Sequence, residues 1–331
     1  MRYSVHLYVL FFSLSLFGCN NQNSSTPTAA PGTPGSSLER VTLALNWYPE
    51  AEHGGFYTAQ LEGYFAEEGL KVEIIPGGPG APVVPMVAGR TVDFAVGNAD
   101  QVILGRAQQA NVVALMTPLQ KSPRCIMVHA ESNITSFDQL ENMTVAMNGG
   151  RSFAAYLQSQ LPLTGVNIVP YNGNLIPFLE DKNFATQGYV FSEPFTAKEK
   201  GANPHTLMVY DMGFNPYTSL LMTSDSLKKE NPVLVQKMTR ACIKGWQKYL
   251  ADPAATNTHL HKLNPELSDE MLEFGVEAIR PLCELPEAGE LTFGQMTLKR
   301  WTTLIDQMIE AKVIEGDRVK AGECFLALPG E

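Results

Sequence analysis

The chain has 331 residues, of which 44% are hydrophobic and 18% charged, a balance typical of a globular protein. Its length is too great for one ordinary core and predicts two lobes of roughly 100–200 residues each. The formal net charge of −10 argues against a basic stripe for a phosphate backbone, so we expect no nucleic-acid partner.

The N-terminus has the pattern of a secretion signal. A basic residue precedes the apolar run 5–17, which is too short to span a bilayer as a helix. The motif Leu16-Phe17-Gly18-Cys19 is similar to a bacterial lipobox, which predicts a lipoprotein signal peptide over 1–18 and an acylated Cys19. The alternative is an ordinary signal peptide that is cleaved near Asn21, with Cys19 lost.

Residues 19–38 are rich in Asn, Ser, Thr, Pro and Gly and carry almost no charge. This composition predicts a flexible tether of roughly 25 Å or more rather than a domain. We therefore expect an exported protein, anchored by lipid at the periplasmic or cell-surface face. The sequence does not say which membrane holds the anchor.

Residues 41–75 read as a strand–helix–strand unit, with strands at 41–45 and 72–75 around a helix at 56–68. Aromatic residues gather where the first strand gives way to the helix. Because ligands in an open α/β sheet lie outside the carboxyl ends of the strands, we expect this turn to face a ligand.

The alternation of strands and helices continues to about residue 223, and the remainder of the chain is helical. Further strands are predicted at 92–96, 112–116, 125–128, 144–147, 166–171, 188–191, 206–210 and 219–223. Further helices are predicted at 82–88, 100–108, 153–160, 176–182, from 193, 232–250, 268–280 and 292–311. Pro281 is taken to stop the second-last of these, and Thr292 and Gln295 to form a capping box for the last. Trp246 and Trp301 are interpreted as core residues.

This order predicts two α/β lobes joined by two crossings, with helices at the C-terminus that cover the first lobe. We expect lobe I to comprise 39–124 and 219–331, and lobe II to comprise 125–218, with boundaries that are only approximate. Paired lobes of this kind bind a ligand in the cleft between them and close by hinge motion.

Several motifs resemble one family. They are Asn46-Trp47-Tyr48-Pro49-Glu50, His53-Gly54-Gly55, Gly77-Gly78-Pro79-Gly80 and Phe191-Ser192-Glu193-Pro194-Phe195. Together they make most of 41–250 similar to the SsuA/THI5-like (NMT1/THI5) substrate-binding proteins of ABC transporters. The resemblance implies the two-lobed periplasmic-binding-protein fold of the type II kind, and an ABC permease with its ATPase subunits as partners. We also expect a monomer without cofactor or enzymatic activity.

The expected ligand is a small polar molecule, and the resemblance extends to a heteroaromatic one like the pyrimidine precursors of thiamine. Aromatic faces at Trp47 and Tyr57 suit a flat ring, and a Glu193 carboxylate suits its N–H donors. The glycine-rich turns suit an anion or carbonyl. The full set of ligand-binding candidates is Asn46, Trp47, His53, Tyr57, Gly80, Asn98, Gly149, Gly150, Arg151, Ser152 and Glu193.

Each candidate has a structural alternative: tight turns need glycine, and an acidic residue at a helix start is favoured by the helix dipole. The other functions considered are a binding protein for a small anion of the sulfonate or nitrate type, and a pyrimidine synthase of the THI5 kind. The synthase is disfavoured because the Cys-rich motif of those enzymes is absent. A sensor domain is disfavoured because no transmembrane helix or signalling module follows.

The sequence predicts no metal site, since the two histidines of His259-x-His261 lack ligands at suitable spacing and read as a solvated face. Four cysteines follow Cys19, namely Cys125, Cys242, Cys283 and Cys324. The sequence leaves two alternatives: a disulfide bridge from Cys283 to Cys242 or to Cys324, or four buried free thiols.

Overall fold

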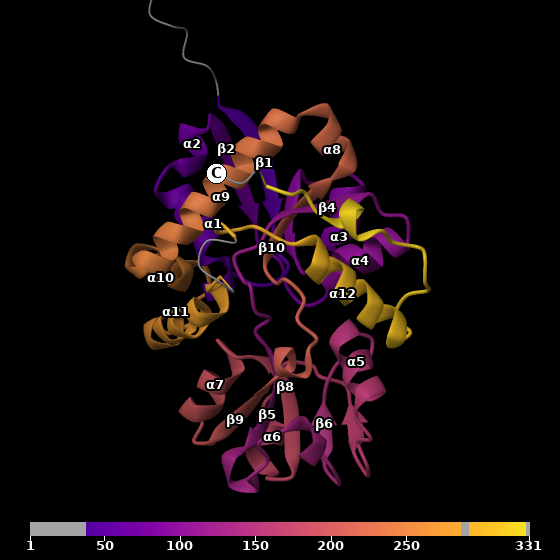
Figure 1. Cartoon of the computed structure of the whole chain (residues 1–331). Coiled ribbons are helices and arrows are strands. Elements are labelled where there is room, and N and C mark those ends of the chain that lie inside the picture. Colours follow the sequence, from indigo (N-terminus) through magenta and orange to yellow (C-terminus); the bar gives the residue numbers. More distant parts are fainter. Residues whose placement is uncertain (1–37, 286–290, 329–331) are drawn as a thin grey trace, which may run out of the picture. The chain divides into compact units, whose positions relative to one another are not determined.

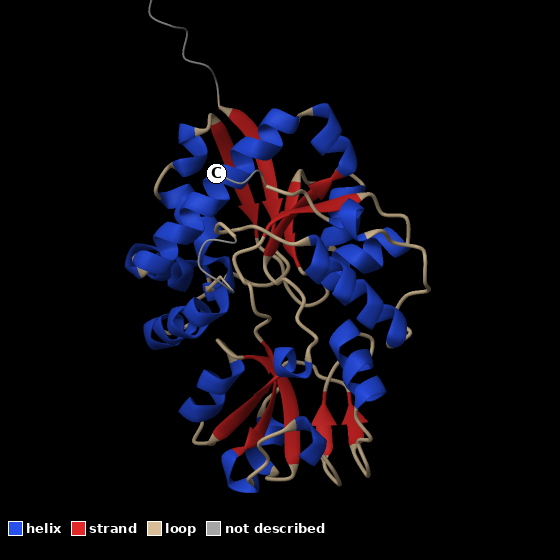
Figure 2. Cartoon of the chain, in the orientation of Figure 1, coloured by secondary structure: helices blue, strands red, loops and turns tan. Residues whose placement is uncertain are grey.

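The computed structural model describes residues 38–285 and 291–328. The predicted signal peptide, the lipidation site Cys19 and all of the predicted tether except Leu38 lie outside the described residues. The described part contains two five-stranded sheets, each with helices packed against it (Figures 1 and 2). We use the names lobe I and lobe II for the bodies built on the first and the second sheet.

The sheet of lobe I has the strand order β2-β1-β3-β10-β4. The strand β1 pairs in parallel with β2 and β3, and β10 runs antiparallel between β3 and β4. The strands are β1 (Glu39–Ala44), β2 (Leu70–Ile75), β3 (Phe94–Gly97), β4 (Val112–Met116) and β10 (Leu220–Ser224). Every residue of β3, β4 and β10 is buried, as expected for strands covered on both faces.

The sheet of lobe II has the order β7-β6-β8-β5-β9 and repeats the same plan. The strand β6 pairs in parallel with β7 and β8, and β5 runs antiparallel between β8 and β9. The strands are β5 (Arg124–His129), β6 (Thr144–Ala146), β7 (Asn167–Val169), β8 (Phe184–Tyr189) and β9 (Pro204–Met208).

Helices follow the strands in both lobes. Before β10 they are α1 (Gly54–Leu61), α2 (Tyr64–Glu67), α3 (Val83–Ala88), α4 (Ala99–Ala107), α5 (Ser152–Gln160), α6 (Ile176–Glu180) and α7 (Glu193–Glu199). After β10 they are α8 (Asp225–Glu230), α9 (Pro232–Ala251), α10 (Ala254–Leu263), α11 (Asp269–Cys283), α12 (Leu298–Glu310) and α13 (Ala321–Cys324). Short 3-10 turns are η1 (Ala51–His53), η2 (Ala130–Ser132), η3 (Phe137–Gln139) and η4 (Val209–Met212).

Most predicted elements lie within two residues of the bounds in the structure, and four differ by more than that. The helix expected at 56–68 is split into α1 and α2, because Gly63 between them adopts a left-handed conformation with φ of 77°. The strand expected at 188–191 lies earlier, as β8, and ends at Tyr189. Pro281 does not stop α11 and lies inside it. The last long helix begins at Leu298 with Thr297 as its N-cap, while Thr292 donates its backbone N–H to Gln295 within a separate turn.

The C-terminal helices pack mainly on lobe I. A long contact joins α9 to α1, and Trp246 of α9 and Trp301 of α12 are fully buried, as predicted. Two of these helices also reach lobe II: α12 packs against α5, and α11 against α7. In Figure 1, α12 is drawn in yellow beside α5.

Cys125, Cys242, Cys283 and Cys324 are all free and buried, which confirms the alternative of four free thiols. Burial raises the pKa of each thiol. Within 38–285 and 291–328, no helix is both long and apolar enough to cross a membrane.

Candidate functional site

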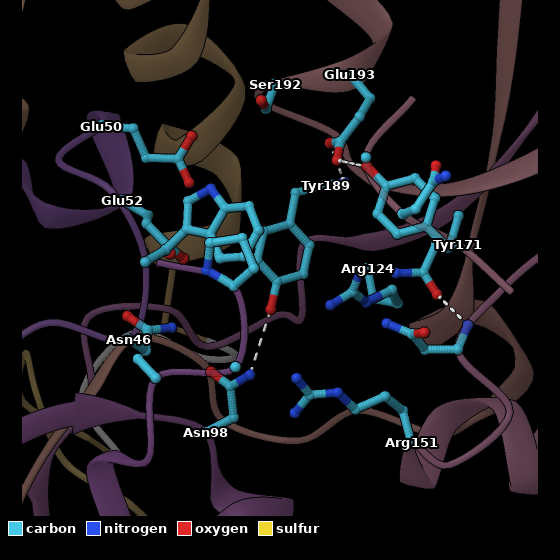
Figure 3. A pocket seen from close by; sticks show the side chains of 18 of the residues that line it. Asn46, Glu50, Glu52, Asn98, Arg124, Arg151, Tyr171, Tyr189, Ser192 and Glu193 are labelled. Carbon is cyan, nitrogen blue, oxygen red and sulfur yellow. Dashed lines mark hydrogen bonds between the residues drawn. The ribbon is translucent and has the colours of Figure 1, made fainter. Parts of the chain in front are cut away.

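A cavity of about 230 Å³ is lined by residues from both lobes (Figure 3). Its walls combine amide, carboxyl, guanidinium and aromatic side chains, with a glycine-rich loop at one edge. The lining residues are Asn46, Trp47, Glu50, Glu52, Pro79, Gly80, Ala81, Asn98, Gln101, Arg124, Asn148, Arg151, Tyr171, Asn172, Gly173, Gln187, Tyr189, Ser192 and Glu193.

The wall from lobe I is the turn that follows β1. Asn46 lies just beyond the end of this strand, and its Oδ1 lies 3.0 Å from Nε2 of the buried His53. Because an amide oxygen only accepts, Nε2 is the donor of this bond. Burial lowers the pKa of His53 to about 3, so the imidazole is neutral near pH 7. The histidine therefore orients Asn46 toward the cavity from behind.

Two acidic residues of the same turn, Glu50 and Glu52, line the cavity. The Oε2 atom of Glu52 accepts a hydrogen bond of 2.9 Å from the Ser219 hydroxyl, at the start of the strand that returns to lobe I. Burial, with the repulsion of Glu52 and Glu193, raises the pKa of Glu50 well above its usual value. Burial also raises the pKa of Glu52 to about 7, against the opposing effects of Ser219 and Arg124.

The wall from lobe II is organised around Glu193, the first residue of α7. Its Oε1 accepts a hydrogen bond of 2.7 Å from the Tyr171 hydroxyl, and its Oε2 accepts one of 2.7 Å from the backbone N–H of Tyr189. Gly188 gives this carboxyl room, since an added Cβ there would lie 3.0 Å from the Cβ of Glu193. Glu193 thus fixes the Tyr171 ring at the cavity wall.

Arg124 lies beside these aromatic rings. Its guanidinium carbon is 4.0 Å from the ring centroid of Tyr189 and 4.9 Å from that of Phe153. Both separations lie within the range of a cation–π contact. Among the described residues, neither Arg124 nor Arg151 forms an ion pair with a carboxylate, so both guanidinium groups remain available to a ligand.

Asn98 and Tyr189 connect the two walls. The Nδ2 group of Asn98, the residue before α4, donates a hydrogen bond of 3.2 Å to the Tyr189 hydroxyl (Figure 3). The Oδ1 atom of Asn98 accepts from the backbone N–H of Ser219. The cavity is therefore bounded on one side by a direct polar contact between the lobes.

Six of the residues predicted from the sequence lie along this cavity, namely Asn46, Trp47, Gly80, Asn98, Arg151 and Glu193. The structure places the other five elsewhere. His53 and Ser152 are fully buried, and Tyr57 is buried with its ring 5.6 Å from that of His259. Gly149 and Gly150 are exposed and do not line the cavity.

Several cavity-lining residues with charged, amide or hydroxyl side chains were not among the candidates from the sequence. They are Glu50, Glu52, Gln101, Arg124, Asn148, Tyr171, Gln187, Tyr189 and Ser192. Glu50 and Glu52 were visible as acidic residues in the turn after the first strand, which was already expected to face a ligand. Arg124 was harder to find because it begins a strand, and only the antiparallel pairing of β5 with β8 brings that start to the cavity edge.

The chemistry of the cavity suits noncovalent recognition of a small polar molecule. Aromatic rings supply flat surfaces, carboxyl oxygens accept hydrogen bonds, and guanidinium groups donate them. The described residues contain no group of three or more His, Cys, Asp and Glu side chains that could hold a metal ion.

The fold is that of solved periplasmic binding proteins. The aliphatic sulphonate binding protein SsuA from Escherichia coli matches with a TM-score of 0.68 at 13% identity, over 88% of this chain and 94% of that one. This likeness confirms the expected two-lobed α/β fold.

Three curated relatives match at the level of sequence. The riboflavin-binding protein RibY of Chloroflexus aurantiacus is 28% identical over 268 residues, 76% of each chain. The formylaminopyrimidine-binding protein of Halalkalibacterium halodurans is 26% identical over 310 residues, 90% of each chain. A 4-amino-5-hydroxymethyl-2-methylpyrimidine phosphate synthase of Saccharomyces cerevisiae is 24% identical over 258 residues, 71% of this chain and 74% of the enzyme.

The family assignment rests on a sequence model described as NMT1/THI5 like, which matches residues 50–256, well over half of the chain. The residues that it spans include both acidic residues of the lobe I turn and Glu193 of lobe II. The chain belongs to the NMT1/THI5-like family.

Proposed function

We propose that the protein is a solute-binding protein that captures a small, polar, heteroaromatic molecule in the cavity between its lobes. The observation that carries this proposal is the combination, in one cavity, of aromatic rings from both lobes with carboxyl groups from both lobes. Trp47 comes from lobe I and Tyr171 and Tyr189 from lobe II, while Glu50 and Glu193 face the same space.

This combination suits a flat ring that carries N–H donors. Aromatic side chains hold a ring by stacking or edge contacts, worth about 0.5–1.5 kcal/mol beyond area burial. Trp47 is 36% exposed and therefore has a free surface to offer. An ionised carboxylate only accepts hydrogen bonds, so it discriminates in favour of amino groups on that ring.

The relatives support a solute-binding role. Two of them are named as binding proteins, for riboflavin and for a formylaminopyrimidine, and both of those ligands contain a nitrogen heterocycle. The relatives also include synthases, but the polar groups of the cavity are accounted for by recognition alone. We therefore propose binding rather than catalysis.

A small anion of the sulfonate or nitrate type is the second candidate. Arg124 and Arg151 line the cavity without an ion pair to a carboxylate in the described residues, and Asn148 lies near them. Guanidinium groups recognise oxyanions by paired hydrogen bonds. The three carboxyl groups of the cavity oppose this ligand class, because each adds repulsion to a bound anion.

The route of delivery is part of the same proposal. An ABC permease with its ATPase subunits would receive the ligand, and the acylated Cys19 would hold a monomeric protein at the membrane. The support is the lipobox-like motif, the composition of residues 19–38 and the family. Mass spectrometry of the mature N-terminus tests the anchor: acylated Cys19 is expected, and a free N-terminus several residues away would contradict it.

Native mass spectrometry of the purified protein tests the ligand class. We expect a co-purified heteroaromatic molecule that is released by denaturation, and a Trp47→Ala variant that retains less of it. Recovery of a sulfonate or another small anion would favour the second candidate. Saturable turnover of the bound molecule would contradict a purely binding role.

A further inference from the structure

The unpartnered carboxyl group of Glu50 points to the charge of the ligand. We propose that Glu50 is a specificity-determining residue and selects ligands that carry a cationic amino group on the heteroaromatic ring. This inference rests on the proposed binding function and deepens it, because it assigns a charge and an orientation to the ligand.

Glu50 differs from the other carboxyl groups of the cavity in having no partner of its own. Its side chain is 8% exposed and lines the cavity. No hydrogen bond or ion pair to its carboxyl group is found among the described residues. In contrast, Glu52 accepts from Ser219, and both oxygens of Glu193 accept from groups of lobe II. Because its carboxyl group lines the cavity, a ligand bound there can supply a donor to Glu50.

The backbone of Glu50 is held in place, so this side chain stays beside the cavity. Its carbonyl oxygen accepts a hydrogen bond of 2.9 Å from the backbone N–H of His53. The preceding residue, Pro49, accepts one of 3.2 Å from the Asn264 side chain. Figure 3 shows the Glu50 carboxyl group directed into the cavity, across from Glu193.

The electrostatic surroundings of Glu50 favour a cation over a neutral group or an anion. Burial and the repulsion of Glu52 and Glu193 raise the pKa of Glu50, while no positive group is among the causes. The guanidinium of Arg124 acts on Glu52 instead. An ammonium or ring-protonated group beside Glu50 would relieve this repulsion, whereas an anion would add to it. The Glu50 side of the cavity is thus its negative end.

In the ligand-free protein, the ionised form of the unpartnered Glu50 carboxyl is unfavourable. Burial and the repulsion of Glu52 and Glu193 disfavour the charged form of Glu50, and a partner of opposite charge removes that penalty. A cationic ligand would supply the missing partner, so its affinity would include the relief of this repulsion. A neutral ligand of the same shape would leave most of it in place.

Two pyrimidines of nearly the same shape test the inference by calorimetry. The probe 4-amino-5-aminomethyl-2-methylpyrimidine carries an ammonium group near pH 7, and its N-formyl derivative does not. We expect the wild-type protein to bind the amine more tightly than the formyl derivative by about tenfold or more, the equivalent of one hydrogen bond to a charged group. Equal affinities, or tighter binding of the formyl derivative, would overturn the inference.

Three variants identify the residue that is responsible. Glu50→Gln keeps the shape of the side chain and should lower the affinity for the amine about tenfold to a hundredfold while changing that for the formyl derivative little. Glu50→Asp keeps the charge and should retain the preference for the amine. Glu73→Gln is the matched control, since Glu73 is exposed on β2 and the substitution makes the same change in charge.

The outcomes separate this inference from the proposed function. A preference for the amine that survives Glu50→Gln would overturn the role of Glu50 but leave the binding function in place. Binding of the formyl derivative but not of the amine would likewise overturn the role of Glu50 and leave the binding function in place. If neither pyrimidine binds and a sulfonate does, the second candidate function stands and the inference is wrong. Circular dichroism of each variant excludes unfolding as the cause of lost binding.

Discussion

The residues of the cavity are arranged so that buried polar groups hold one another in place. His53 donates to Asn46, and Ser219 donates both its hydroxyl to Glu52 and its backbone N–H to Asn98. Each bond fixes the orientation of a side chain that lines the cavity. The same burial makes the site costly for folding, because it places ionisable groups away from water.

Glu52→Gln should stabilise the ligand-free protein at alkaline pH. The pKa of Glu52 is about 7 in the folded protein, against 4.5 for the isolated group. Between these values the folded state binds more protons here than the unfolded state, so the free energy of unfolding falls as pH rises and stays lowered above pH 7. Glutamine removes this loss. We expect a gain on the order of 2–4 kcal/mol at about pH 8, and little change at about pH 4.5.

Urea unfolding of both proteins at the two pH values measures this difference. His53 titrates in the opposite sense, because its lowered pKa makes stability fall as pH drops below about 6.5. The histidine is present in both proteins, but its Nε2 lies 3.5 Å from a carboxyl oxygen of Glu52, so its contribution differs between them. At about pH 8 it is neutral in both the folded and the unfolded state and adds no pH dependence there. A difference between the two proteins that is the same at both pH values would show that folding does not shift the pKa of Glu52.

Glu193→Gln should weaken ligand binding more than Tyr171→Phe does. Each oxygen of Glu193 already accepts one bond within lobe II, and each has a second lone pair for a ligand donor. The glutamine replaces one oxygen by a donor, and such a loss typically costs about 2–5 kcal/mol, roughly thirtyfold to several thousandfold in affinity. Tyr171→Phe removes the hydroxyl but leaves the carboxylate intact.

Calorimetry with the co-purified ligand compares the two variants. Equal losses in both would mean that Glu193 acts only by positioning Tyr171. Unchanged or tighter binding by Glu193→Gln would instead indicate an anionic ligand, since a negative charge has been removed from its surroundings.

The sequence predicted the part of the site that follows parallel strands. Asn46 and Trp47 follow β1, and Asn98 follows β3. These positions agree with the rule that ligands lie outside the carboxyl ends of the strands in an open α/β sheet. The rule could not find Arg124, which begins an antiparallel strand. It also could not separate Trp47, which faces the cavity, from Tyr57, which packs inside lobe I, because both are aromatic residues of the same segment.

At the scale of elements, the contact between α1 and α9 depends on glycine. Trp246 and Tyr249 of α9 occupy the space above Gly55 and Gly54 of α1, and Gly245 lies against the carbonyl oxygen of Gly55. Side chains at these glycines would overlap the opposite helix. The close approach positions α1, which directly follows the turn that carries Glu50 and Glu52.

Gly55→Ala should destabilise the protein by about 1–3 kcal/mol, the usual cost of overpacking a close contact. The new Cβ would overlap the Trp246 ring, which is fully buried. Gly322→Ala in α13 is the control, because a Cβ added there would meet no atom within 4 Å. Thermal unfolding of both variants measures the effect; similar midpoints would show that the contact adapts.

Most elements were predictable because their signals are local. The run of apolar residues 112–116 marked the bounds of β4, and Asn231 with Pro232 marked the start of α9, where the Asn231 side chain accepts from Leu234. The helices α8 and α10 were not predicted because their sequences contain few apolar residues at helical spacing. Pro281 was misread because a proline in the last turn of a helix need not end it when the tertiary packing of α11 holds that turn.

At the scale of the whole molecule, the two crossings between the lobes are tied to each other and to α12. Leu119 of the first crossing pairs with Thr218 of the second. The side-chain oxygen of Asn215 accepts from the backbone N–H of Ser122, and its carbonyl oxygen accepts two hydrogen bonds from Arg300 of α12. A hinge motion of the lobes would therefore turn about a connection that α12 supports from one side.

The lobes should close on the ligand, because the carboxyl and aromatic groups that line the cavity come from both of them. Glu50 and Glu193 repel across the ligand-free cavity, and a bound cation would remove this repulsion and allow a closer approach. Small-angle X-ray scattering with saturating ligand should then give a smaller radius of gyration than without it. The same ligand added to Glu50→Gln at a concentration that does not saturate that variant should leave the curve nearly unchanged. A curve that does not change for the saturated wild-type protein would instead indicate a preformed, rigid cavity.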